Sequence, residues 1–148
     1  MAASQEFLKP SGAEQFFNRA FGALVGMGIG PSYCYLLQVR GRKTGKLYST
    51  PVNMMEVEGK RVLVAPRGRT QWVRNAEATG EVTLKRGSFQ KRFRLRELGV
   101  PEKLPILKQY LDDYRSAVQR YFSVRAGSPP EAFGEVADRH PVFELTQI

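Results

Sequence analysis

The sequence predicts an α+β protein whose antiparallel strands close into a barrel, with a helix near each end of the chain and a short helix inserted between strands. Short apolar runs rich in β-branched residues alternate with glycine-containing turns, which is typical of consecutive hairpins. A segment after Pro101 repeats apolar residues at intervals of three and four, as an amphipathic helix does. Closure of the sheet into a barrel would leave no unpaired strand edge.

A length of 148 residues, 42% of them hydrophobic, suits one ordinary core. We therefore expect a single domain. Its parts are an N-terminal helix with a connector, the main strands, and a C-terminal helix with a last strand, over residues 1–30, 33–98 and 101–148.

The first element expected is a helix over Gly12–Leu24. Ser11 and Glu14 form a capping box, because the hydroxyl and the carboxylate each satisfy a free amide. The glycines from Gly26 onward and Pro31 end this helix. The apolar residues here are too few to span a bilayer and do not follow the order of a secretory signal, so we expect a cytoplasmic protein. A peripheral membrane contact through this helix is the alternative to a helix that covers one end of the core.

Three strands separated by turns come next. Gly41–Lys46 has turn composition, with two glycines and three cations, and Glu58 and Gly59 form the following turn. Pro51 restricts its strand to a sheet edge or a bulge, because proline donates no ladder hydrogen bond. The expected strands, of which the second and third form a hairpin, are Tyr33–Val39, Leu47–Val57 and Arg61–Pro66.

The second half of the chain begins with a short helix over Gln71–Thr79, for which Thr70 is the expected N-cap and Gly80 the terminator. The elements expected after it are a hairpin of Glu81–Lys85 and Ser88–Leu98, a helix from near Leu104 to Phe122, and a last strand over Val142–Leu145.

The outer strand of that hairpin has one apolar and one basic face. Phe89, Phe93 and Leu95 alternate with Gln90, Arg92, Arg94 and Arg96. The arginine row is either a solvated sheet face or part of a nucleic-acid-binding surface. We expect no nucleic acid, because a surface for stacked bases needs its aromatic residues on the same face as its cations.

Cys34 and His140 are the single cysteine and the single histidine of the chain. A disulfide framework and a zinc site of Cys and His are therefore excluded within one chain. Cys34 lies in an apolar run, where a cysteine usually behaves as a small buried hydrophobe rather than a nucleophile.

Positive charge is concentrated in the middle of the chain. Between Arg40 and Arg96 lie 15 of the 23 Lys and Arg residues but only four of the 14 acidic residues. The net charge of +9 is thus largely a property of this segment. It indicates an anionic partner there, which is a nucleic acid, an anionic lipid surface or a polyanionic small molecule.

The turn Gly41–Lys46 has the composition of an anion-binding loop. It is not a Walker loop, because three rather than four residues separate its glycines and Leu47 rather than Ser or Thr follows the lysine. Its glycines still permit close backbone approach, its cations attract an anion, and the Thr44 hydroxyl offers a hydrogen bond. A basic hairpin turn without a ligand has the same composition.

An ordered set of residues over about Leu36–Gly87 resembles the deazaflavin-dependent nitroreductase family, also described as quinone reductases of the flavin split-barrel class. The set is Leu36-Leu37, Gly41-Arg42-Lys43-Thr44-Gly45-Lys46, Thr50-Pro51-Val52, Gly59, Leu63-Val64-Ala65, Gly68, Trp72, Asn75 and Gly80. The resemblance implies a split β-barrel and coenzyme F-420, an 8-hydroxy-5-deazaflavin whose tail carries a phosphate, a lactate and glutamates. Such a tail would account for the basic segment.

The resemblance also implies site residues. Lys43 and Lys46 match phosphate-contacting positions, and Tyr48 stands where relatives have a further basic residue. Positions that match the ring site are Pro51, Val52, Ala65, Pro66, Arg67, Gly68, Trp72 and Asn75, and the tail site adds Arg42, Thr44 and Gly45. Trp72 is equally well explained as a core anchor. The expected substrate phenols are Tyr110 and Tyr114, for which helix packing or a place on the surface is the alternative.

The function that this resemblance implies is transfer of a hydride from the reduced deazaflavin to a quinone, an enone or a nitroaromatic compound. The cofactor carries such chemistry, which suits a sequence without a nucleophile or a paired-carboxylate site. FMN is the rival cofactor, because one phosphate also satisfies Lys43 and Lys46. A cofactor or lipid carrier without turnover is a further alternative, and a homodimer is a possible assembly.

Overall fold

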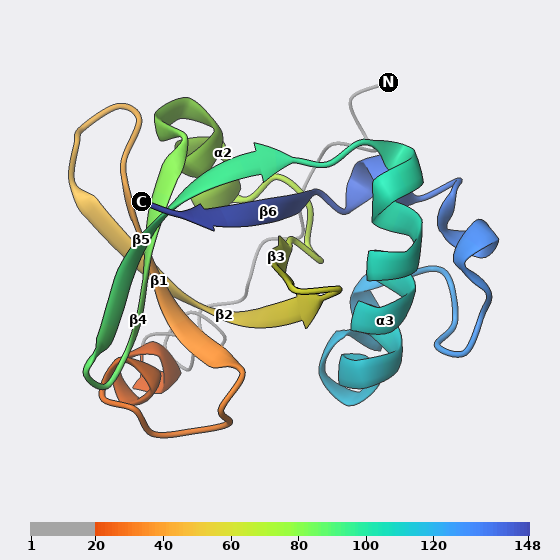
Figure 1. Ribbon diagram of the computed structural model, residues 1–148, viewed down its shortest axis with the longest axis horizontal. Helices are drawn as coiled ribbons and strands as arrows, with labels where there is room; N and C mark the ends of the chain where they lie inside the picture. Colours follow the sequence, from red (N-terminus) through yellow and green to blue (C-terminus); the bar gives the residue numbers. More distant parts are fainter. Residues whose placement is uncertain (1–19) are drawn as a thin grey trace.

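The computed structural model describes residues 20–148, and six of its strands form a closed antiparallel barrel (Figure 1). The strands are β1 (Cys34–Arg40), β2 (Leu47–Val57), β3 (Lys60–Val64), β4 (Glu81–Arg86), β5 (Phe89–Glu97) and β6 (Val142–Gln147). Their order around the barrel is β1-β2-β3-β6-β5-β4. The predicted α+β fold with an antiparallel barrel is confirmed, and both predicted hairpins are present.

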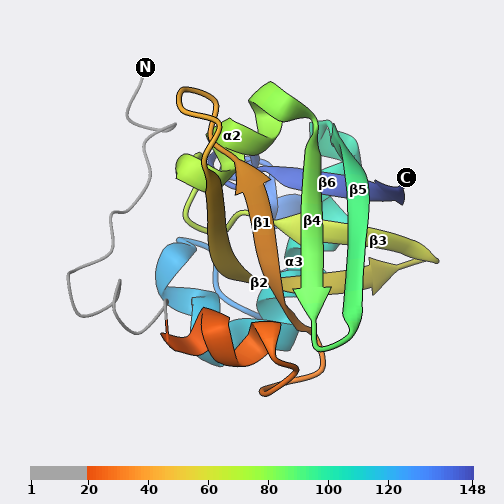
Figure 2. The same cartoon turned by 90° about the vertical axis from the view of Figure 1, so that its left-hand side faces the viewer.

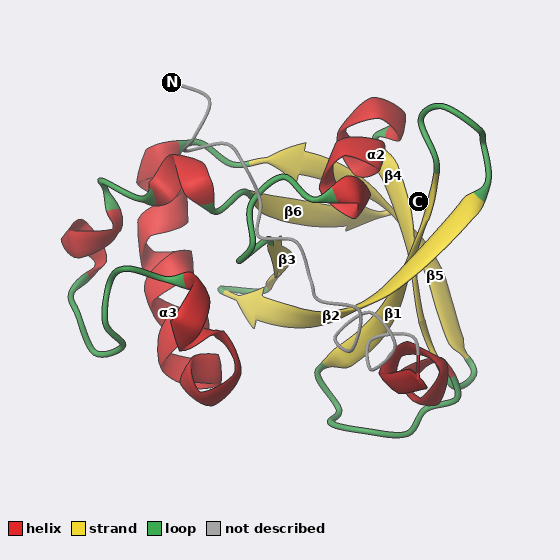
Figure 3. Ribbon diagram, turned by 180° about the vertical axis from the view of Figure 1, so that it is seen from behind, coloured by secondary structure: helices red, strands yellow, loops and turns green. Residues whose placement is uncertain are grey.

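The helices lie outside the barrel (Figure 3). They are α2 (Gln71–Thr79), α3 (Val100–Val118) and the 3-10 turns η2 (Gln119–Tyr121), η3 (Pro130–Phe133) and η4 (Ala137–Arg139). Residues 20–26 are also helical, whereas the part of the predicted helix Gly12–Leu24 before residue 20 lies outside the described residues.

Several predicted boundaries were wrong. Helix α3 begins at Val100 rather than near Leu104, because Pro101 occupies its first turn, where a missing N–H costs no helical hydrogen bond. It ends at Val118 and tightens into η2, after a non-helical φ of −117° at Tyr114. Strand β3 ends at Val64, and Pro66 belongs to the turn that follows.

Strand β2 changes neighbours half-way along its length. Residues 47–53 pair with β1, whereas 54–57 pair with β3. Within the described part of the chain, no strand pairs with the other edge of residues 47–53. Pro51 lies in this half of β2. Proline has no N–H to donate, and the free edge has no partner strand that would need one. The prediction that Pro51 lies at a sheet edge is therefore confirmed. The same edge provides one wall of the cavity described below.

Of three apolar clusters among the described residues, the two larger ones hold the barrel and α3 together. One fills the barrel around Leu37, Leu84 and Phe93, each fully buried. The other lies between α3 and the barrel, where Leu107 and Leu111 pack with Phe133. Truncation of such a leucine to alanine typically costs about 2–5 kcal/mol, so the docking of α3 depends on this second cluster.

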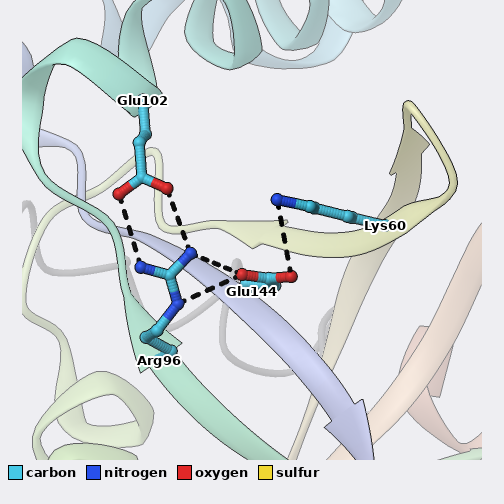
Figure 4. Close-up of polar contacts among 4 residues, drawn as sticks. All are labelled: Lys60, Arg96, Glu102 and Glu144. Atoms are coloured by element: carbon cyan, nitrogen blue, oxygen red, sulfur yellow. Dashed lines mark hydrogen bonds and ion pairs between the residues drawn. The ribbon is translucent and has the colours of Figure 1, made fainter.

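The arginine row of β5 is exposed, and part of it is paired within the chain. Arg96 donates to Glu102 at 3.0 Å and to Glu144 at 2.6 Å, and Lys60 lies 3.9 Å from Glu144 (Figure 4). These pairs connect β5 to β6 and to the first turn of α3. They neutralise positive charge that would otherwise attract the phosphate backbone of a nucleic acid.

Candidate functional site

A cavity of about 270 Å³ opens beside the unpaired half of β2. Its walls are that strand edge, the turn from the end of β3 to α2, and the inward side of α3 and η2. The volume is slightly below the roughly 300–1,000 Å³ usual for small-molecule sites. Eight predicted site residues line it, namely Pro51, Val52, Ala65, Pro66, Arg67, Gly68, Trp72 and Tyr110.

The turn between β3 and α2 is held by backbone hydrogen bonds. The amide of Ala65 donates to the Pro141 carbonyl at 2.8 Å, and that of Gly68 donates to Ala65 at 3.2 Å. Gly68 has a φ of 87°, in the left-handed region that a side chain would strain. The chain can therefore reverse here with Pro66 and Arg67 facing the cavity.

His140 supports this turn from behind. Its Nδ1 lies 2.9 Å from the Pro66 carbonyl, which can only accept, so Nδ1 carries the proton. The ring stacks on Phe122 with centroids 4.1 Å apart. Burial lowers the pKa of His140 to about 4, while the hydrogen bond to Pro66 opposes that shift. The imidazole is thus neutral near pH 7 and acts as a hydrogen-bond donor.

Tyr110 and Asn53 form a polar part of the cavity wall. The Asn53 side chain donates a hydrogen bond to the Tyr110 phenol oxygen, and Asn53 Oδ1 accepts the Cys34 thiol at 3.2 Å. Burial raises the pKa of Tyr110 well above its usual range and also raises that of Cys34. Both groups therefore stay protonated near pH 7, and the phenol can donate a proton in a hydrogen bond.

The surface position considered for Tyr110 was wrong, because the residue is only 3% exposed. Tyr114 does not line the cavity. Its ring packs between those of Tyr110, at 5.2 Å, and Tyr33, at 4.9 Å. Burial, aided by the charge of Asp113, raises the Tyr114 pKa to about 12. The structure thus brings Tyr110 to the cavity and leaves Tyr114 behind it.

Thr70 precedes α2 in the extended conformation of an N-cap, but its side chain makes no capping hydrogen bond. Thr70 is thus the N-cap residue as expected, although without a side-chain capping bond, and Gly80 ends the helix in the left-handed conformation as expected. The Thr70 hydroxyl oxygen is buried and has no hydrogen-bond partner among residues 20–148.

The basic turn Gly41–Lys46 is a closed loop at the same end of the barrel as α2 (Figure 2). The amide of Gly41 donates to the Lys46 carbonyl at 2.7 Å, and the Thr44 hydroxyl accepts from the Lys46 amide at 3.2 Å. A Cβ on Gly41 would lie 2.6 Å from the Tyr48 ring, so a side chain here would require this exposed ring to shift. Lys43 and Lys46 are exposed.

Arg42 and Asn75 tie this loop to α2 rather than line the cavity. The buried Asn75 Oδ1 accepts from the Arg42 amide at 3.0 Å and from its guanidinium at 2.8 Å. The guanidinium also donates to Gln71 at 3.0 Å. These bonds hold the loop in one orientation. Lys43 and Lys46 take no part in them.

The loop and the cavity are connected by the start of β2. Lys46 directly precedes the strand, and Thr50 is the first β2 residue at the cavity. Four residues of extended chain span about 13 Å. A planar group in the cavity and an anion at the loop could therefore belong to one elongated molecule.

Among the described residues, no group of three or more His, Cys, Asp or Glu side chains could hold a metal ion. In the same part of the chain, no helix is both long and apolar enough to cross a bilayer.

A protein-family model described as "F420H(2)-dependent quinone reductase" matches residues 13–125. The chain belongs to this family. It is accordingly an oxidoreductase that uses coenzyme F-420, and the resemblance noted from the sequence is confirmed. The residues present fit this coenzyme, since the cavity offers apolar surface from Pro51, Val52 and Trp72 beside polar side chains, and the loop has exposed lysines.

Several solved structures share the fold. "Structure of F420-H2 Dependent Reductase (FDR-A)" is 21% identical with a TM-score of 0.54, and the match covers 78% of this chain and 95% of that one. A chain described as a domain-swapped dimer is 19% identical with a TM-score of 0.55, over 92% and 100%. Protein Atu2129 of Agrobacterium tumefaciens, of unknown function, is 20% identical with a TM-score of 0.53, over 95% and 57%. No curated protein matches the chain.

Sequence reasoning missed several cavity residues. They are Phe21, Thr50, Asn53, Val64, Thr70, Ala117 and Tyr121. Asn53 carried a usable signal, because it is a lone amide in an otherwise apolar stretch next to Pro51 and Val52. Tyr121 carried none, because its position depends on where α3 tightens into η2.

Proposed function

We propose that this enzyme uses reduced coenzyme F-420 to reduce a small electron-poor acceptor, namely a quinone, an enone or a nitroaromatic compound. The observation that carries the proposal is the pairing of a cavity that has both apolar and polar walls with an exposed, preorganised basic loop. When bound, the coenzyme supplies a hydride from C5 of its ring. The protein then needs to provide binding, orientation and electrostatics.

The residues of the cavity suit those tasks. Arg67 is the one charged side chain among the described residues that line it. We propose that its guanidinium stabilises the negative charge that develops on a reduced acceptor. Pro51, Val52 and Trp72 exclude water and hold flat ring systems by their apolar surfaces.

Tyr110 is the residue that we propose to orient the acceptor. Its phenol remains protonated because of burial, and Asn53 fixes its direction by a hydrogen bond. A neutral phenol can donate to a carbonyl or nitro oxygen without adding charge to the cavity. Tyr114 keeps the Tyr110 ring in place through their edge contact.

Lys43, Lys46 and the backbone of their loop are proposed to bind the phosphate of the tail. A phosphate accepts from both ammonium groups, and each charge-assisted bond is typically stronger than a neutral one. FMN carries one phosphate and remains the rival ligand. The basic excess beyond one phosphate supports the longer anionic tail of the deazaflavin.

Turnover is tested by mixing the reduced coenzyme with menadione and following oxidation of the coenzyme. We expect oxidation that depends on both the acceptor and the protein, and a slower rate for Arg67→Ala. A protein that binds the coenzyme but gives no acceptor-dependent oxidation would instead be a carrier.

We further propose a cytoplasmic enzyme that contacts membrane surfaces and forms a homodimer. Exposed apolar residues within and just after the helix of residues 20–26 support the membrane contact, since Leu24, Met27 and Ile29 are 42%, 65% and 53% exposed. Flotation with anionic and neutral vesicles tests it. The similar structure described as a domain-swapped dimer supports the homodimer, which sedimentation equilibrium tests.

A further inference from the structure

The turn between β3 and α2 depends on two consecutive residues from the C-terminal end of the chain. The Ala65 amide donates to the Pro141 carbonyl at 2.8 Å, and His140 Nδ1 donates to the Pro66 carbonyl at 2.9 Å. Within the turn, the Gly68 amide donates to the Ala65 carbonyl at 3.2 Å. Two neighbouring residues of the turn are thus each fixed from outside it.

The bond from His140 determines the backbone orientation next to Arg67. The Pro66 carbonyl and the Arg67 amide belong to one peptide unit, which is planar and trans. A donor that holds the carbonyl therefore also holds the amide. Pro66 and Arg67 line the cavity, whereas His140 does not. His140 thus acts on the cavity through the backbone of the turn.

His140 is itself held by several contacts. The residue is 3% exposed, and its ring stacks on Phe122 with centroids 4.1 Å apart. Its amide donates to the Ala137 carbonyl at 3.2 Å, and Lys103 Nζ donates to that same carbonyl. Lys103 lies near the start of α3 and is 4% exposed. A series of buried contacts therefore runs from α3 through Ala137 and His140 to the turn beside the cavity.

Packing alone does not explain these two side chains. Burial lowers the pKa of both Lys103 and His140, which means that their surroundings oppose a positive charge. An apolar residue at either position would avoid that cost. It would not supply a donor to the Pro66 or the Ala137 carbonyl in a fixed direction. The hydrogen bonds of Lys103 and His140, rather than their apolar surface, therefore distinguish these residues.

We infer that His140 is a positioning residue for Arg67, and that Lys103 holds His140 for this task. By fixing the peptide unit between Pro66 and Arg67, His140 limits the positions that the guanidinium can take beside the acceptor. The inference rests on the proposed role of Arg67 in stabilising the reduced acceptor. Position matters for such a group, because a misplacement of about 1 Å can cost about a hundredfold in rate.

Two variants separate the donor of His140 from its ring. His140→Asn keeps a side-chain donor close to the place of Nδ1 but loses the ring, whereas His140→Phe keeps a ring and has no donor. In reduction of menadione by the reduced coenzyme, kcat should fall about tenfold for His140→Phe, as the loss of one hydrogen bond implies, and His140→Asn should recover most of it. The KM for menadione should change much less than kcat, because the lost interaction belongs to the charged transition state.

A double-mutant cycle shows whether His140 acts through Arg67. If it does, His140→Phe should lower kcat no further in an Arg67→Ala background. Lys103→Met should lower kcat by a smaller factor than His140→Phe, and should also have no effect without Arg67. Lys108→Met is the matched control, because Lys108 also joins α3 to a backbone carbonyl, that of Ser128 at 3.0 Å, and does not line the cavity. It should keep the kcat of the parent.

Trp72 provides a measurement that needs no coenzyme. It is the single tryptophan of the chain, and it lines the cavity just after the turn. In the coenzyme-free protein, acrylamide should quench its fluorescence more strongly in His140→Phe than in the parent, and Lys108→Met should behave like the parent. If His140→Phe does not fold, Lys103→Met is subjected to the same cycle and quenching measurements.

The inference is overturned if the folded variants keep the kcat and the quenching of the parent, if their losses persist without Arg67, or if His140→Asn loses as much as His140→Phe. A parent that oxidises the coenzyme with no acceptor would contradict the proposed function, and the role of His140 with it. Normal turnover of the parent combined with any of the first three results would contradict the inference alone.

Discussion

The cavity and the basic loop differ in how they are built. The cavity walls rest on the core, since Ala65, Val73 and Tyr110 are at most 3% exposed. The loop lies in solvent and is held by its own backbone and by the tether of Arg42 to Asn75. Shape and exclusion of water should therefore determine what binds in the cavity, whereas screened charge should determine what binds at the loop.

The largest expected effect lies on the cavity side and concerns pH. Because the folded pKa of His140, about 4, is below the ordinary value of 6.5, the unfolded chain binds this proton more readily. Stability should fall as the pH drops from about 6.5 to 4, by up to about 3 kcal/mol from this residue. Lys103 and Arg139 lower the His140 pKa and Asp138 raises it.

Urea unfolding of the parent and of His140→Gln at several pH values measures this contribution. The difference between the two proteins removes the titration of carboxyl groups, which both share. A difference that does not change with pH would show that His140 is not a buried neutral donor to Pro66.

Trp72→Ala should have the next largest effect, on coenzyme affinity. The indole lines the cavity and packs against Phe143 with centroids 6.1 Å apart. Its removal opens one wall, and we expect about hundredfold weaker binding, equivalent to about 3 kcal/mol. The loss should be the same at low and high salt, as titrations at two ionic strengths would reveal. Recovery of affinity at high salt would assign Trp72 to the tail.

Lys43→Ala should weaken coenzyme binding about ten- to hundredfold, because a charge-assisted bond to phosphate is worth roughly 1.5–3 kcal/mol. In contrast to Trp72→Ala, the loss should shrink as salt is added. Lys91→Ala, an exposed lysine on β5, is the control and should bind like the parent. If Lys43→Ala binds normally at low salt, the loop is a turn without a ligand.

The smallest effect is expected for Cys34→Ala. The thiol is buried, its pKa is raised by burial, and it donates to Asn53. A protonated thiol is not a nucleophile, so reduction of menadione should stay within a few-fold of the parent. Abolished turnover in a folded, coenzyme-binding Cys34→Ala would refute hydride transfer without a protein nucleophile.

The difference between the loop, built from contiguous residues, and the cavity, built from distant ones, explains what the sequence could predict. Local signals were sufficient for the strands, for α2 between Thr70 and Gly80, and for the loop, whose glycines and cations are contiguous. They were misleading at the start of α3, which was expected near Leu104, whereas the helix begins at Val100 with Pro101 in its first turn.

Contacts between distant segments could not be predicted. His140 meets the Pro66 carbonyl across 74 positions, and Arg42 meets Asn75 across 33. The residues that shape the cavity are therefore the ones that only the fold reveals.

The most direct test of the division between cavity and loop compares coenzyme F-420 with its tail-less deazaflavin riboside in titrations over a range of salt concentrations. We expect tighter binding of the full coenzyme at low salt, a steep loss of that advantage with added salt, and nearly constant affinity for the riboside. Combined replacement of Lys43 and Lys46 by alanine should abolish the advantage and leave riboside binding intact. Equal salt dependence of the two ligands, or an unchanged advantage in the double variant, would contradict the account.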